Sequence, residues 1–439
     1  MNIGKEIAVK KILQAKLYSL VRCIAKMLTK PERKFVKNMI YGIIRSKTCI
    51  IRQIVISNDE KASVKKVSEK YRNHLSKPHL HTKISHAILM KSARKINRDT
   101  IIAVDDSDIM KPEAEKMEGL KIVRDGSNVY KHTLGYKLMN IAAVNSKGAN
   151  EIEIVPVMSE LFSDEIEIDT AKNVLFDQIN DIQIASENKG IFTFDRGYDD
   201  KKLFDNLLSN DADFIVRSKT NRKLYLDGNE MKFIEVAKCA KLDMTFRTSS
   251  KNEIRAGAIR VEIKVNPHKL KIPQTVSLWL IVCRYVNKPK NLKDDFVEEG
   301  GFFYLYANIR HLNDNKKALV EKCISGYKLR WKIEEFHRHV KQDFGWEKMQ
   351  LMTYVRLKNL NAILLAALSL IYSMYDIKLM LYRIFPNKMM DRERDKDRII
   401  FIYYRITAIA NYLFSFWKLR ERKKYKGQYA EQMQLKLKF

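Results

Sequence analysis

Apolar side chains recur at helical spacing through the first hundred residues, with Lys and Arg placed between them. Residues 5–56 follow this pattern, and Pro31 stands where a second helix begins. Two further basic helices are predicted within residues 61–75 and 83–97. The pattern therefore predicts an all-helical region over residues 1–99.

Short runs rich in β-branched residues replace the helical pattern from residue 100 onward. Five such runs are predicted to be strands: 100–104, 136–144, 151–157, 190–194 and 213–218. Helical patterns over about 169–183 and 200–209 separate the last three strands. The order β-β-β-α-β-α-β predicts an α/β unit, a mixed sheet with flanking helices, across residues 100–219.

A β-rich segment and three long helical patterns complete the chain. Residues 220–310 contain many short strand-like runs and are predicted to be a β-rich insertion. The helical patterns follow it, over about 314–348, 353–383 and 396–420. We expect residues 311–350 to complete the α/β unit and residues 351–439 to form a helical C-terminal region. Leu360–Tyr372 is the most apolar stretch, but it is short for a bilayer span and is predicted to be a buried helix.

The net charge indicates what kind of partner the protein binds. The 82 Lys and Arg residues exceed the 52 Asp and Glu residues by 30, and 18 of this surplus lies in residues 1–100. An excess of this size attracts polyanions, with nucleic acid the leading candidate and a membrane surface or a ribosome the alternatives. A helical bundle with a solvated basic face has the same composition. We favour DNA contact by residues 1–99 and no membrane partner.

The five cysteines bear on the compartment and on metal binding. They form no CxxC pair, and their number is odd. A disulfide framework or a zinc site is therefore not expected, and the usage fits a reducing cytoplasm. The N-terminus lacks the apolar core of a signal peptide, so the expected location is cytoplasmic.

Acidic residues follow two of the predicted strands directly. Asp105, Asp106 and Asp108 come after the strand 100–104, and Asp195 comes after the strand 190–194. Carboxylates at the C-terminal ends of strands project into the crevice where α/β sheets bind ligands, and they suit Mg²⁺ or Mn²⁺. Each has an ordinary alternative, an acidic turn or an N-cap. Two acids in the same topological position are more specific than either alone.

A third acid, Glu334, lies in the helical pattern 314–348. At 100° per residue, an arc of about 80° contains Tyr327, Arg330, Glu334, Arg338 and Lys341. The opposite face is apolar: Leu329, Ile333, Phe336, Val340 and Phe344. The polar face suits a phosphate backbone beside a metal site, and a solvated face with i,i+4 ion pairs is the alternative.

The spacing Tyr327-x2-Arg330-x3-Glu334-x6-Lys341 resembles the Y-R-E-K signature of DDE transposases from bacterial insertion sequences, of the insertion-sequence-four type. The sequence DDSDIMKP resembles the first acidic motif of that family, and FTFDRGYD resembles the second. The likeness extends over about residues 100–350 in the same order. The basic helical N-terminus and the β-rich segment between the second and third acids are also similar to the layout of that family.

The resemblance implies a ribonuclease H-like catalytic core interrupted by a β insertion. It implies that Asp105, Asp195 and Glu334 are the catalytic residues and bind Mg²⁺ or Mn²⁺, as two ions. Two divalent ions about 3.5–4 Å apart can activate the nucleophile and stabilise the leaving oxygen of a phosphodiester. Strand-end position and the D-x-S pattern favour Asp105 as the first ligand, with Asp106 the alternative.

The resemblance also implies how DNA is handled. Tyr327, Arg330 and Lys341 would contact phosphates of the transposon end, and a homodimer would bridge two ends. The expected reaction is cut-and-paste transposition, in which the freed 3′-OH attacks target DNA. Two other hypotheses stay open: a nuclease of the same fold without strand transfer, and a DNA-binding protein without catalysis.

Some histidines and one tryptophan are weaker candidates. A metal site at the cluster His74, His79, His81 and His86 is not expected, because no acid or cysteine has suitable spacing. His337 lies at the edge of the polar face, where an auxiliary role is open. For Trp331, a packed interface is favoured over stacking on a displaced base.

Overall fold

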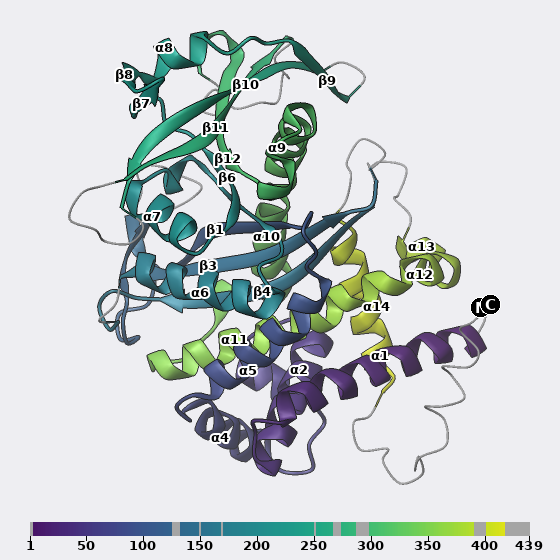
Figure 1. Ribbon diagram of the computed structural model, residues 1–439. Coiled ribbons are helices and arrows are strands. Elements are labelled where there is room, and N and C mark those ends of the chain that lie inside the picture. The colour runs from purple at the N-terminus through teal and green to yellow at the C-terminus, as the bar shows by residue number, and fades with distance from the viewer. Residues whose placement is uncertain are drawn as a thin grey trace.

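A mixed β-sheet forms the middle of the molecule, and a bundle of helices from both ends of the chain packs against it (Figure 1). The computed structural model describes residues 3–124, 132–148, 151–167, 170–249, 252–266, 274–286, 298–389 and 401–417. All statements on structure below concern these residues.

Five strands make up the part of the sheet that carries the candidate site. They are β1 (Ile101–Met110), β3 (His132–Ser146), β4 (Ile152–Phe162), β5 (Ile191–Phe194) and β6 (Asp213–Arg217). Their order is β4-β3-β1-β5-β6; β3 is antiparallel to both neighbours, and β5 and β6 run parallel to β1. This is a ribonuclease H-like sheet, so the expected fold class is confirmed, and all five predicted strands are present.

Four helices cover the two faces of these strands. They are α6 (Ala171–Ser186), α7 (Lys201–Ser209), α9 (Lys316–Arg330) and α10 (Lys332–Phe344). Side chains alternate along a strand, so β1 contributes to two cores. Ile102 and Val104 lie in the core with α6 and α7, whereas Ile101 and Ala103 lie in the core with α9 and α10. The alternation continues into the acidic residues that follow.

The strands of the predicted insertion extend the same sheet. They are β7 (Lys223–Leu226), β8 (Asn229–Lys232), β9 (Met244–Ser249), β10 (Asn252–Val265), β11 (Gln274–Tyr285) and β12 (Phe302–Asn308). β12 pairs with β6, and the order continues β11-β10-β7-β8, with β9 on β10. A short strand β2 (Lys121–Arg124) pairs with β3, and a short helix α8 (Phe233–Lys238) follows β8. The β-rich segment is thus continuous with the core sheet.

Strand β1 is longer than its sequence predicts. The prediction ended the strand at residue 104, before the acidic run, but β1 continues to Met110. The reason is its neighbour β3, which pairs with β1 along the whole length, as far as Gly135 opposite Met110. Pairing with β5 on the other side ends at Ala103. The acids therefore lie within a strand that is paired on one side.

The helical pattern over 314–348 is divided into α9 and α10. The break is the single residue Trp331, which keeps right-handed helical angles (φ −55°, ψ −18°). The amide nitrogen of Glu334 donates to the carbonyl of Trp331 at 3.1 Å and starts the second helix. The prediction of one continuous helix over about 314–348 is therefore wrong.

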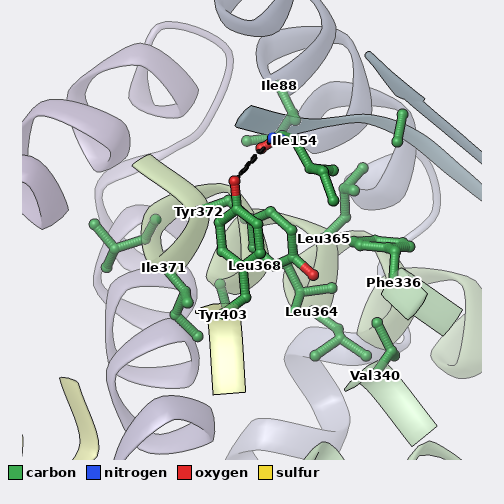
Figure 2. Packing of buried hydrophobic residues seen from close by; sticks show 14 of the residues in the cluster. Ile88, Ile154, Phe336, Val340, Leu364, Leu365, Leu368, Ile371, Tyr372 and Tyr403 are labelled. Carbon is green, nitrogen blue, oxygen red and sulfur yellow. Dashed lines mark hydrogen bonds between the residues drawn. The ribbon is translucent and has the colours of Figure 1, made fainter. Parts of the chain in front are cut away.

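Helices from both ends of the chain share one apolar core. The N-terminal helices are α1 (Ile3–Ala25), α2 (Lys30–Ser46), α3 (Ile51–Ser57), α4 (Val64–Leu75) and α5 (Leu80–Ser92). The C-terminal ones are α11 (Tyr354–Ser373), α12 (Lys378–Ile384), α13 (Pro386–Met389) and α14 (Ile402–Ser415). Figure 2 shows α11 in this core, where Leu364, Leu368 and Tyr372 lie near Phe336 of α10. The helical character of residues 1–99 is confirmed, while the domain limits stay a prediction.

Helix α11 is apolar on nearly all sides because it is buried. The segment Tyr354–Ile384 is long and apolar enough to cross a bilayer by length and composition, yet 78% of its apolar window is buried inside the protein. The prediction of a buried helix over Leu360–Tyr372 is therefore confirmed.

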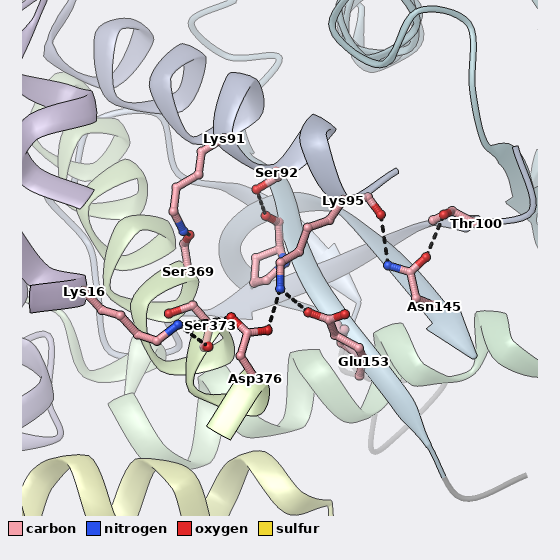
Figure 3. A network of polar contacts seen from close by, with 12 residues as sticks. Lys16, Lys91, Ser92, Lys95, Thr100, Asn145, Glu153, Ser369, Ser373 and Asp376 are labelled. Atoms are coloured by element: carbon pink, nitrogen blue, oxygen red, sulfur yellow. Dashed lines mark hydrogen bonds and ion pairs between the residues drawn. The ribbon is translucent and has the colours of Figure 1, made fainter. Parts of the chain in front are cut away.

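A chain of ion pairs joins the helices to the sheet (Figure 3). Asp376, just after α11, accepts from Lys16 of α1 at 3.1 Å and from Lys95 at 2.9 Å. Lys95 also pairs with Glu153 of β4. One lysine thus connects the C-terminal helices to the sheet, and the shared carboxylate connects both to α1.

We expect Tyr403→Phe to lower the free energy of unfolding by about 1–3 kcal/mol, the usual cost of a buried unsatisfied polar group. The buried hydroxyl of Tyr403 accepts a hydrogen bond from the amide of Ile154 at 2.8 Å and links α14 to β4 (Figure 2). Urea denaturation measures the change. Tyr404→Phe is the control, because the Tyr404 hydroxyl bonds Gln342 at the surface. Equal effects of the two substitutions would contradict the prediction.

Candidate active site

The register of two parallel strands brings Asp105 and Asp195 together. Ala103 of β1 pairs with Thr193 of β5, so the same register puts Asp105 level with Asp195 two residues further on. Side chains at one level of a parallel pair point the same way. Both carboxylates therefore project from the sheet beyond the last paired residues. Gly197 donates its amide to Asp195 Oδ1 at 2.8 Å and fixes that carboxylate.

Strand alternation separates Asp105 from Asp106. Asp105 continues the face of Ile101 and Ala103, which α9 and α10 cover. Asp106 continues the opposite face, where Tyr198 packs against the core of α6 and α7. Asp105, rather than Asp106, thus points toward the helices that carry Arg330 and Glu334.

Arg330 lies between two of the acids. Its Nη2 is 3.0 Å from Glu334 Oε1, and its Nη1 is 3.6 Å from Asp105 Oδ2. Only 6% of the Arg330 side chain is exposed, against 16% for Asp105 and 31% for Glu334. Arg330 ends α9 and Glu334 lies in the first turn of α10, so the pair spans the break at Trp331. Through its contacts with both acids, Arg330 connects Glu334 to Asp105 of β1.

The electrostatics of Asp105 reflect this crowding. Burial raises the pKa of Asp105 to about 7, the positive charge of Arg330 opposes the rise, and the negative charges of Asp195, Glu334 and Asp106 add to it. Asp105 and Asp195 in turn raise the pKa of Arg330, against the effect of its burial. The three predicted acids are thus close enough to influence one another through Arg330.

The other two residues of the Y-R-E-K spacing have different surroundings. The ring of Tyr327 is buried, with the guanidinium groups of Arg217 and Arg330 over it at 5.8 and 5.7 Å from its centre. Lys341 donates to the backbone carbonyl of Asp108 at 2.6 Å and pairs with Glu347 at 3.4 Å. Tyr327 and Arg330 are therefore buried inside the protein. The helical spacing had instead predicted that they lie on an open polar face.

The donor set fits divalent cations in chemical type. Asp105, Asp195 and Glu334 offer the carboxylate oxygens that Mg²⁺ and Mn²⁺ prefer. Among the described residues, however, no three His, Cys, Asp or Glu side chains are grouped closely enough to hold an ion as they stand. The guanidinium of Arg330 lies between Asp105 and Glu334. Its Nε and Nη1 atoms are buried without a hydrogen-bond acceptor in the part of the chain that the structure describes, so the site offers charge and donors to a ligand.

Two residues near the acids were missed by sequence reasoning. Arg217 is buried at the C-terminal end of β6, a strand end next to that of β5, and this shared position is the signal that could have found it. Tyr198 lies in the FTFDRGYD motif, and its buried hydroxyl lies beside the carboxyl group of Asp106. Burial and the negative charges of Asp106 and Asp105 raise the pKa of Tyr198.

The weaker candidates have mostly structural surroundings. His81 lies beside Asn359, and His74 stacks on Phe35 with ring centres 4.8 Å apart. Burial and the charges of Lys341 and Arg330 lower the pKa of His337 to about 3, so this side chain is neutral near neutral pH. Trp331 is 44% exposed in the single chain, so the favoured interpretation, packing at an interface, stays a prediction.

The sheet and its flanking helices define a ribonuclease H-like protein. The chain belongs to the Transposase DDE domain family, whose sequence profile matches residues 97–370. This membership assigns it to the proteins of DNA transposition. No curated protein matches the sequence. One solved structure that it resembles is a cryo-EM structure of the piggyBac transposase synaptic complex with hairpin DNA, at 8% identity and a TM-score of 0.34. That likeness covers 84% of this chain and 60% of the other.

We expect wild-type protein to lose stability between about pH 5 and pH 7, with a chelator present, because of Asp105. The folded state keeps a proton on this carboxyl up to about pH 7, whereas the unfolded chain loses it near the ordinary pKa of 3.8. Unfolding therefore releases a proton between these values, and the free energy of unfolding falls as pH rises, by on the order of 2 kcal/mol. Urea denaturation of Asp105→Asn should lack this part of the decrease.

The matched control for this experiment is Asp227→Asn, on the exposed turn between β7 and β8. It should follow wild type at both pH values. If Asp105→Asn also loses as much stability as wild type, the raised pKa of Asp105 is refuted.

Proposed function

We propose that the chain is a cut-and-paste transposase of the insertion-sequence-four type. It binds the ends of an insertion sequence, cuts DNA by metal-dependent hydrolysis of phosphodiester bonds and joins the 3′-OH ends to target DNA. The observation that carries the proposal is that Asp105 and Asp195 lie level on adjacent strands, with Glu334 beside Asp105 across Arg330. A sheet edge with acids on neighbouring strands and a third acid on the covering helix suits phosphoryl transfer.

The catalytic residues in this proposal are Asp105, Asp195 and Glu334, which would hold Mg²⁺ or Mn²⁺, as two ions. When bound, the ions supply an activated nucleophile and stabilise the leaving oxygen. Rigid placement is the contribution of the chain itself. Asp105 and Asp195 are on paired strands, and Glu334 is on a helix anchored in the core by Ile333 and Phe336. The fold itself thus sets the backbone positions of the three acids.

Tyr327, Arg330 and Lys341 are the proposed contacts to phosphates of the transposon end. Support comes from Arg330, two of whose buried nitrogen atoms lack an acceptor, and from the cationic side chain of Lys341 at Asp108. A phosphate oxygen would accept from such donors, and a guanidinium can bind two oxygens at once. Trp331, exposed between α9 and α10, adjoins the same place.

A basic groove in the N-terminal helices supports DNA binding by residues 1–99. The groove lies between α1, α2 and α4 and has a volume of about 1030 Å³. Six of its cations are Arg22, Arg33, Lys34, Lys37, Lys66 and Lys70, and Glu60 is an acid in its wall. A cationic groove of this kind follows a phosphate backbone. We propose it as the contact for end DNA, with a homodimer bridging two ends in the bacterial cytoplasm.

Glu334→Gln should reduce cleavage of DNA by more than about 100-fold, because even partners of metal ligands are usually worth 10- to 100-fold. The assay is nicking and joining in Mg²⁺ or Mn²⁺ on a plasmid that carries the gene with its flanking DNA. Glu335→Gln is the matched control, since Glu335 is the next residue and pairs with Lys332 at 2.8 Å. Normal cleavage and joining by Glu334→Gln would remove it from the triad. Cleavage without joining by wild type would favour a nuclease.

Replacing Lys34, Lys66 and Lys70 by Ala should weaken DNA binding and flatten its salt dependence. Each phosphate contact contributes about 0.9 to the slope of log K against log salt, so three lost contacts reduce the slope by roughly two to three. Fluorescence anisotropy with a duplex at several salt concentrations measures it. The control replaces three exposed lysines away from the groove, Lys201, Lys202 and Lys317. An equal loss in both triple variants would show a nonspecific charge effect.

A further inference from the structure

Arg330 lies between two of the proposed metal ligands, Asp105 and Glu334, where they would hold an ion. Its guanidinium contacts Glu334 at 3.0 Å and Asp105 at 3.6 Å, and it is almost completely buried. An arginine stays protonated at all physiological pH values, so this is a fixed positive charge among carboxylates. Mg²⁺ binds carboxylate oxygens at about 2.0–2.1 Å and keeps part of its water shell. A cation at that distance and a guanidinium on the same oxygens exclude one another by volume and by charge.

The guanidinium is also incompletely bonded where it lies. Nη2 is hydrogen-bonded to Glu334, but Nε and Nη1 are buried without an acceptor. Buried polar groups without partners are uncommon and destabilising. The contact with Asp105 is therefore an ion pair beyond hydrogen-bond distance. An acceptor with two oxygens, such as a DNA phosphate, would satisfy these donors better than Asp105 does.

From these two observations we infer that Arg330 couples DNA binding to metal binding. In the free protein its guanidinium holds Asp105 and Glu334 and keeps divalent ions out. When a phosphate of DNA accepts the donors of Arg330, the two carboxylates are released to metal. The guanidinium lies over the ring of Tyr327. We infer that it keeps this contact whether it binds the two carboxylates or a DNA phosphate. This inference rests on the proposed function and adds a regulation of the same site.

The coupling has a thermodynamic consequence in both directions. If DNA raises the affinity for metal, metal raises the affinity for DNA by the same factor. The free protein would then bind ions weakly and cut little DNA before an end is seated. Arg338, exposed on α10, contributes the same formal charge without contact to Asp105 in any described pair. It therefore separates a local effect of Arg330 from a general loss of positive charge.

The test is the affinity of the DNA-free, full-length protein for Mn²⁺, measured by electron paramagnetic resonance at about pH 8. Arg330→Gln should bind Mn²⁺ more tightly than wild type by roughly 5- to 150-fold, the usual range of such coupling. Arg338→Gln should stay close to wild type. A saturating duplex of mixed sequence should raise Mn²⁺ affinity in wild type, after subtraction of ions bound to the duplex alone, and not in Arg330→Gln.

Unchanged or weaker Mn²⁺ binding by Arg330→Gln overturns the coupling, as does an equal gain in Arg338→Gln. Arg330→Lys guards against a folding defect, because it keeps the charge but cannot bridge both acids; it should bind Mn²⁺ more tightly than wild type and less tightly than Arg330→Gln. Adding Asp195→Asn to Arg330→Gln should abolish the gained binding. If the ion still binds there, the triad of the proposed function fails, which is distinguishable from failure of the coupling alone.

Discussion

The parallel pairing of β1 with β5 is the contact on which the candidate site depends. Both strands are buried on both faces, so their register is fixed by two hydrophobic cores at once. A slip by one residue would turn Asp105 to the face of α6 and α7 and replace it with Asp106. The acids are therefore positioned by the apolar residues before them, Ile101 to Val104, more than by contacts of their own. The same short stretch of sheet therefore stabilises the fold and positions the acids.

The third acid depends on a different core. Glu334 lies on α10, which is held by Ile333, Phe336 and Val340 against α11, and α11 packs against the N-terminal helices as well. The helices proposed to bind DNA and the helix that carries Glu334 thus share one apolar interior. The ion pairs of Asp376 with Lys16 and Lys95 connect the same parts through polar groups.

Local sequence patterns predicted the helices and strands well, but they predicted the ends of these elements and their tertiary packing less well. The strand and helix order was readable because apolar periodicity is local, but β1 was cut short because acidic residues are rare in strands and only pairing with β3 extends it. The break at Trp331 left the apolar spacing almost unchanged, so periodicity could not reveal it. The acids were identified by strand position, whereas the burial of Arg330 and the approach of Arg217 to Tyr327 depend on tertiary packing.

The buried side chain of Arg330 resolves an electrostatic conflict between the carboxylates of the candidate site. Glu334 has to approach two other carboxylates, and like charges in a buried place raise one another's pKa and oppose assembly. A buried cation between them offsets the repulsion, and Arg330 reaches Glu334 at the i,i+4 spacing that is usual for ion pairs along a helix. A cation that is needed for assembly must nevertheless yield to divalent ions for chemistry. An arginine with unsatisfied donors meets both demands, because phosphate can draw it away at the moment when metal takes its place.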